Sequence, residues 1–167
     1  LLSDAGVIGD MAADEIDGIG AKQESERTDE EKVRLVQLKN LDVYLQDARS
    51  RLSETRRKLQ DRIADGALDR AEAGLGALKR AREQLLDPVT VLQGIAADQL
   101  AVLQQSAFRG LARGEGSSMS MNVPAGPPPV APPWLTVPSL VVRQGAVRDR
   151  VEEVRSRLQA ALDGAAE

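Results

Sequence analysis

The sequence predicts an all-α protein, and three observations support this fold class. Apolar residues make up 42% of the 167 residues but aromatic residues only 2%, so small aliphatic side chains must fill the core, as they do where helix packs on helix. Charged residues make up 29%, which favours long solvated helix faces. Leucines recur at steps of three and four residues, the spacing of one helix face. We expect a long antiparallel helical hairpin or coiled-coil bundle, a Pro-rich strap and a C-terminal helix.

The first segment, residues 1–27, is acidic and contains glycine. Residues 1–31 hold ten acidic side chains and two basic ones, and each glycine inside a helix costs roughly 1 kcal/mol. Apolar residues nevertheless keep helical spacing at Leu1, Ala5, Ile8, Ala12 and Ile16. Two interpretations stay open: a weak amphipathic helix, and a solvated, partly disordered leader.

A helical hairpin or bundle is expected over residues 28–112, and its first helix begins after Thr28. Thr28 and Glu31 have the spacing of a capping box, and the acidic residues between them suit the positive end of a helix. The apolar seam of this helix follows heptad positions. Its members are Leu38, Leu41, Leu45, Ala48, Leu52, Thr55 and Leu59.

The second helix is expected to follow a turn at Asp65-Gly66, with Gly66 as a left-handed C-cap. The turn is indicated because the apolar register shifts there by two residues. The following apolar set is Leu68, Ala71, Leu75, Leu78 and Leu85. Beside it, small residues recur at heptad spacing and would let two backbones approach closely: Ala67, Gly74 and Ala81. The two segments are predicted to pair antiparallel.

A third helix is predicted to begin at Pro88 and to reach Ala112. Asp87-Pro88 has the pattern of an N-cap and a first helical residue, and we favour a kink or short break there over a full reversal. Only Asp98 and Arg109 are charged between these limits. The apolar residues, which include Leu92 and Leu103, spread over most of the helix surface, so we expect a helix buried on several sides.

Residues 113–138 form a Gly/Ser/Met- and Pro-rich linker, and residues 139–167 an amphipathic helix. Seven of the eight prolines lie in this linker, which predicts a stiff, extended strap. Trp134 is expected to be buried and to hold the strap on the helices; the alternative is an exposed Trp134 that awaits a partner. Ser139 is the expected cap of the last helix, whose seam consists of Leu140, Val147, Val151, Val154, Leu158 and Ala161.

Composition excludes several classes of site. The chain has no cysteine and no histidine, which removes disulfides, thiolate catalysis, zinc-finger geometry and histidine-dependent triads. It has no phosphate-binding glycine loop, and its most basic stretch, Arg56–Lys58, is interleaved with acidic residues at helical spacing. We therefore expect no enzyme, no cofactor, no metal ion, no small-molecule substrate and no nucleic-acid partner.

The sequence instead favours a non-enzymatic structural protein that acts through helix–helix packing in a larger assembly. Its seventeen arginines and five lysines are typical of GC-rich bacterial coding. The partner is expected to be a second copy or another helical protein, and the compartment is not indicated. The predicted interaction residues are Leu38, Leu41, Leu45, Leu52, Leu59, Leu75, Leu78, Leu85, Leu92, Leu103, Trp134, Val147, Val151 and Leu158.

The alternative function is that of a secreted or injected membrane-active protein that inserts residues 88–112 after a conformational change. That segment has the length to span a bilayer. Asp98 and its neighbouring glutamines would be costly in lipid, so membrane contact is not expected.

Overall fold

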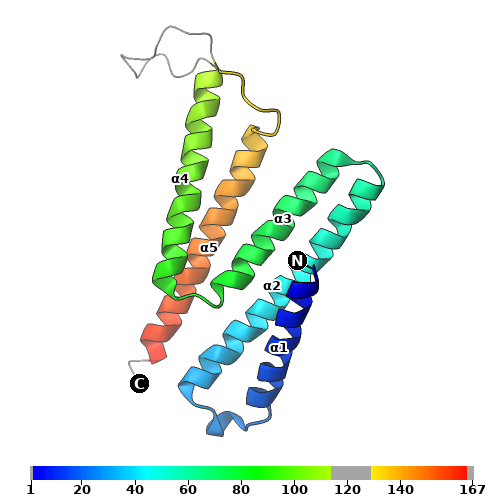
Figure 1. Ribbon diagram of the computed structural model, residues 1–167. Helices are drawn as coiled ribbons and strands as arrows, with labels where there is room; N and C mark the ends of the chain where they lie inside the picture. Colours follow the sequence, from blue (N-terminus) through cyan, green and yellow to red (C-terminus); the bar gives the residue numbers. More distant parts are fainter. Residues whose placement is uncertain (1, 114–128, 165–167) are drawn as a thin grey trace. The chain divides into compact units, whose positions relative to one another are not determined.

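The structure, a computed structural model, describes residues 2–113 and 129–164 (Figure 1). These residues form five α-helices and one 3₁₀ turn, and no strand lies among them. The predicted all-α class is confirmed. The chain divides into two compact units, Leu1–Asp87 and Pro88–Glu167. Most of the predicted linker, residues 114–128, lies outside the described residues.

The first unit begins with helix α1 (Leu2–Gly20), which packs along α2 (Asp29–Gln60). Of the two interpretations of the acidic segment, the amphipathic helix is therefore the one found over residues 2–20. Ala5 and Ala12 are buried in the core of this unit, and Ile16 packs against that core, whereas Ile8 is exposed. The buried side of α1 is lined by alanine, so this helix can lie close to α2.

Arg27 closes the C-terminal end of α1. The last turn of α1 has no basic residue of its own, and its final carbonyl groups lack partners within the helix. The Arg27 guanidinium donates to the carbonyl oxygens of Ile19 (3.1 Å), Gly20 (2.9 Å) and Lys22 (2.8 Å). Between Gly20 and Arg27 the chain forms the 3₁₀ turn η1 (Glu24–Glu26).

Two ion pairs join α1 and its loop to α2. Arg34 donates to both carboxylate oxygens of Glu15, at 2.7 and 3.0 Å. This contact lowers the pKa of Glu15 and raises the pKa of Arg34. Lys22 pairs with Glu31, and the pKa of Glu31 is lowered by the hydrogen bond from Lys22 and by a second one from the backbone of Thr28. The acidic charge of α1 is thus partly neutralised by α2.

The predicted capping box at the start of α2 is confirmed. The backbone N–H of Glu31 donates to the Thr28 hydroxyl (3.2 Å), and the backbone N–H of Thr28 donates to the Glu31 carboxylate (3.1 Å). Two N–H groups that a helix leaves unpaired at its start are satisfied in this way.

Helix α2 ends at Gln60 and reverses through Asp61, Arg62 and Ile63 into α3 (Ala64–Glu83). The N–H of Ile63 donates to the carbonyl of Lys58 (2.9 Å), and the N–H of Arg62 donates to that of Leu59 (3.1 Å). This pair of bonds is a Schellman motif, which needs a left-handed residue just past the helix end. Arg62 takes that conformation, with φ of 59°.

The predicted left-handed cap at Gly66 is therefore wrong. Gly66 lies in the first turn of α3, and the reversal comes earlier because the carbonyls of Lys58 and Leu59 are paired there. Gly66 meets a different constraint: a Cβ at this position would lie 3.0 Å from Cδ of Lys58. The glycine leaves room for that side chain.

Helices α2 and α3 pack side by side as the expected hairpin (Figure 1). On α3 the buried residues are small: Ala67, Gly74, Ala77 and Ala81. A Cβ on Gly74 would lie 3.3 Å from both Cγ and Cδ2 of Leu52 on α2, so a leucine of one helix fills the space that a glycine leaves on the other. The small residues that the sequence placed beside the leucine seam thus form the contact with α2.

The second unit is a hairpin of α4 (Pro88–Ala112) and α5 (Val137–Gly164), which pack together (Figure 1). Helix α4 begins at Pro88 as predicted, after a short break from Glu83. Helix α5 begins two residues before the predicted cap. Thr136 and Ser139 exchange hydrogen bonds, each from a backbone N–H to the other's hydroxyl at 3.1 Å. Ser139 is thus the third residue of a capping box rather than the cap itself.

Candidate interaction surface

Polar contacts between α4 and α5 fix how α4 is turned about its own axis. Arg150, which is only 7% exposed, donates to Asp98 at 2.6 Å. Gln144 donates to Gln99 at 3.0 Å. A third contact joins Arg143 to Gln105 at 2.8 Å, and in a fourth Arg109 donates to the backbone carbonyl of Leu135. These polar side chains of α4 thus all reach α5 or the turn that leads into it.

Branched aliphatic residues complete the contact between the two helices. The buried residues on α4 are Val91, Ile95 and Val102. Those of α5 and the turn before it are Val147, Val154 and Leu135. Because both charged residues of α4, Asp98 and Arg109, are engaged on this side, the opposite side of α4 has no charge.

That opposite side carries a row of exposed apolar residues, which we call the outward face of α4. Its large members are between 41% and 64% exposed: Val89, Leu92, Leu100, Leu103 and Leu111. Ala96 and Ala107 complete the row and are also exposed. The row advances by steps of three, four and four residues, so it stays on one side of the helix from the first turn to the last.

The outward face comes from an 11-residue repeat within α4. Residues 89–99 (VTVLQGIAADQ) and 100–110 (LAVLQQSAFRG) agree at their third, fourth, fifth and eighth positions. The third position gives Val91 and Val102, which are buried, whereas the fourth gives Leu92 and Leu103, which are exposed. Eleven residues make three helical turns, so each copy presents the same side chains in nearly the same directions. One repeat therefore supplies both the face that packs on α5 and the outward face.

The prediction that Leu92 and Leu103 are packed on several sides is not what the structure shows. Both leucines are exposed, at 41% and 61%. The physical reason is that α4 has two apolar sides, and α5 covers the one whose branched residues and polar contacts match its own. The periodicity alone did not distinguish the two sides.

The leucines of α3, like those on the outward face of α4, are mostly exposed. Leu68 and Leu75 are about half-exposed, as is Leu85 just past the end of α3, and Leu78 is partly buried against the core of the first unit. The small residues of α3 occupy the contact with α2, which leaves no room there for the leucine seam. The seam predicted on α3 is thus mostly an exposed row.

The predicted seam of α2 is divided along its length. Leu38, Leu41 and Leu45 are buried in the core beside α1 and Ala81. Leu52 is half-buried over Gly74, and Leu59, in the last turn of α2, is 60% exposed. The half that α1 and α3 both cover is the buried half.

At the start of α5 the anchor of the chain is Leu135 and not Trp134. Leu135 is 2% exposed, whereas Trp134 is 46% exposed and lies under the Arg143 guanidinium, 5.2 Å from the ring centroid. The expected burial of Trp134 is therefore not found. Farther along α5, Val147 is buried, while Val151 and Leu158 are about 40% exposed.

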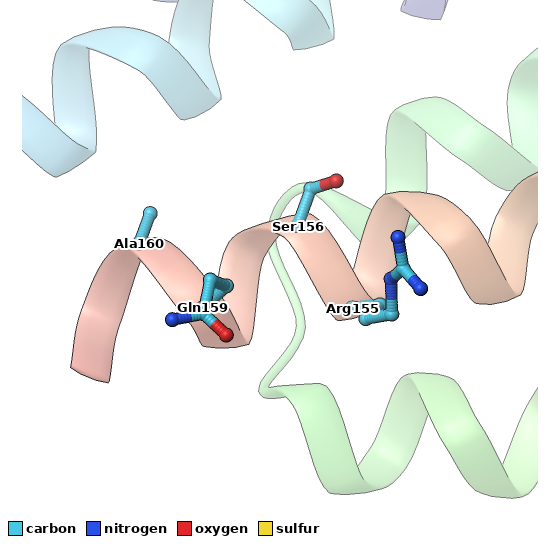
Figure 2. A pocket seen from close by; sticks show the side chains of 4 residues that line it. All are labelled: Arg155, Ser156, Gln159 and Ala160. Atoms are coloured by element: carbon cyan, nitrogen blue, oxygen red, sulfur yellow. The ribbon is translucent and has the colours of Figure 1, made fainter. Parts of the chain in front are cut away.

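The hollow that the structure shows on α5 does not resemble a catalytic or ligand site. A shallow hollow near the end of α5 is lined by Arg155, Ser156, Gln159 and Ala160, all exposed residues of one helix (Figure 2). Ligand sites are instead concave and bring polar groups from several elements together. Across residues 2–113 and 129–164, no acidic cluster is arranged to hold a metal ion. Over the same residues, no helix is both long and apolar enough to cross a membrane.

Comparison of the chain with protein-family models, with curated proteins and with solved structures gives no match.

Proposed function

We propose that this protein is a non-enzymatic assembly module that binds another protein chain through the outward face of α4. The observation that carries the proposal is that this face is apolar, exposed and without charge over the whole helix. Contiguous exposed apolar surface of this kind is typical of protein or membrane contacts. Each large side chain on the face would gain about 1 kcal/mol on moving from half-exposed to buried.

A helical partner suits this face better than a lipid surface does. Helices that lie on membranes combine an apolar face with lysines and arginines that reach the anionic headgroups. The only cation of α4 is Arg109, and it is bonded to the carbonyl of Leu135. A partner helix needs no such charges, because leucine and alanine rows on two helices can interlock directly.

The test is to measure the mass of the purified full-length protein by light scattering over a hundredfold range of concentration, with a vesicle-binding assay in parallel. We expect a mass above that of one chain at the high end and no sedimentation with vesicles of mixed neutral and anionic lipid. A monomer at every concentration that sediments with the vesicles would contradict the proposal and favour the membrane-active alternative.

A further inference from the structure

We propose that the partner of the outward face is a second copy of this chain, and that the two α4 helices pair antiparallel about a two-fold axis between Gln99 and Leu100. The inference rests on the proposed function, since it names what covers the same face.

The outward face is complementary to itself when it is reversed. The repeat gives α4 two exposed leucines, Leu92 and Leu103, and two exposed alanines, Ala96 and Ala107. With the axis between Gln99 and Leu100, Leu92 of one copy stands level with Ala107 of the other. Ala96 of the first copy likewise stands level with Leu103 of the second. Each of these two leucines therefore meets an alanine, which is the alternation of large and small residues that fills space between packed helices.

The packing of a large residue against a small one also occurs within the first unit. In the hairpin of α2 and α3, also antiparallel, Leu52 fills the space over Gly74. A parallel pair of α4 helices in register would instead place leucine against leucine and alanine against alanine. The alanine layers would then leave voids, which cost packing energy.

Charge is also compatible with two identical faces. Identical charged faces repel each other, but the charged residues of α4 are turned toward α5, where Asp98 binds Arg150 and Arg109 binds Leu135. The antiparallel arrangement also sets the positive end of each helix dipole beside the negative end of the other. Two copies of the hairpin would together form a four-helix bundle with α4 helices at its centre.

The first experiment compares two charge substitutions on α4 by mass. Leu103→Glu places a carboxylate in the face, whereas Ala101→Glu places the same charge on an exposed residue outside the row. Because neither residue is buried, both variants should keep the helical circular dichroism of the parent, and also its melting temperature at protein concentrations where the parent is monomeric. We expect Leu103→Glu to raise the dimer dissociation constant at least a hundredfold and Ala101→Glu to change it less than threefold. Equal behaviour of the two variants would overturn the assignment to this face.

The second experiment tests the orientation with single cysteines, which are unambiguous because the chain has none. Leu100→Cys lies beside the axis and should form a disulfide-linked dimer under mild oxidation, since bridging needs Cα atoms about 4.4–6.8 Å apart. Val89→Cys and Leu111→Cys lie at opposite ends of α4. Each alone should give no cross-linked dimer, whereas a mixture of the two should.

The outcomes separate the inference from the proposed function. A dimer in which Val89→Cys cross-links with itself is parallel; it overturns the orientation but leaves an assembly module. A dimer whose cysteines at these three positions never cross-link overturns the use of α4. A chain that stays monomeric at all concentrations overturns the self-pairing. If that monomer also binds vesicles, the proposed function falls as well.

Discussion

At the scale of single residues, Arg62 is the non-glycine residue that has a positive φ in the part of the chain that the structure describes. It holds a left-handed conformation, which costs an L-residue roughly 1–2 kcal/mol and costs glycine nothing comparable. The conformation is retained because the Schellman bonds to Lys58 and Leu59 depend on it.

We therefore expect Arg62→Gly to stabilise the protein by about 1 kcal/mol. The measurement is the free energy of unfolding by denaturant, followed by circular dichroism. Ser53→Gly, in an exposed position of α2, is the control, and it should destabilise by about 0.5 kcal/mol because glycine is a poorer helix former than serine. A loss of stability in Arg62→Gly would mean that the turn lies elsewhere.

Glu15 gives the contact of α1 with α2 a dependence on pH. Its pKa is lowered by Arg34, so the folded chain binds a proton less readily than the unfolded chain, whose glutamate has a pKa of about 4.3. The stabilisation is therefore present above about pH 4.3 and is lost as the pH falls through the lower pKa of the folded state.

We expect Glu15→Gln to lower the melting temperature at pH 7 and to leave it unchanged near pH 2.5. The pair is largely solvent-exposed, so its contribution should not exceed about 1 kcal/mol. Thermal melts of both proteins at the two pH values measure the difference. A gap in melting temperature that is as large at pH 2.5 as at pH 7 would show that the carboxylate does not act through Arg34.

At the scale of helices, α3 shows why its buried side could not be predicted from leucine spacing. Both its leucine row and its row of small residues repeat at heptad positions. Helix α2 determines which of the two rows is buried, because its leucines need small residues opposite them. The spacing of residues along one helix does not indicate the shape of the helix that packs against it.

Two glycines of α3 provide a matched test of this packing. A Cβ at Gly74 would press on Leu52, whereas a Cβ at Gly76 would meet nothing within 4 Å. Gly74→Leu should destabilise by about 1–3 kcal/mol through overpacking. Gly76→Leu should stabilise by up to about 1 kcal/mol through helix propensity. Denaturant unfolding of both variants decides the matter, and a stabilising Gly74→Leu would contradict the close approach of α2 and α3.

The features that could be predicted well from the sequence are those that depend on residues close together in the chain. The capping box of Thr28 and Glu31 and the start of α4 at Pro88 both depend on residues a few positions apart. What it predicted poorly depends on contacts across helices. The turn is set by hydrogen bonds around Arg62, Leu135 replaces Trp134 as the anchor, and α5 decides which side of α4 is covered.

At the scale of the whole molecule, the chain is built from two units whose helices are neighbours in sequence. The core of the first unit comes entirely from α1, α2 and α3. Such a unit should fold without the rest of the chain, since its contacts are local and its core is contiguous.

We expect residues 1–87, expressed alone, to be helical and to unfold cooperatively. Circular dichroism during a thermal melt measures this, and Gly76→Leu should raise the melting temperature of the fragment as it does in the full chain. A fragment without a cooperative transition would mean that the first unit depends on the second.

The proposed pairing of two α4 helices would also limit how far an assembly can grow. An interface that pairs a surface with its own copy is used up on both chains once it forms, so it makes a closed pair and not a fibre. A helix also offers no unpaired backbone edge to further chains, as an open strand does. A higher protein concentration should therefore raise the fraction of chains that are in dimers. It should not produce larger particles through α4. Any larger assembly would need a second interaction surface, and we expect that surface to be the exposed leucines of α3.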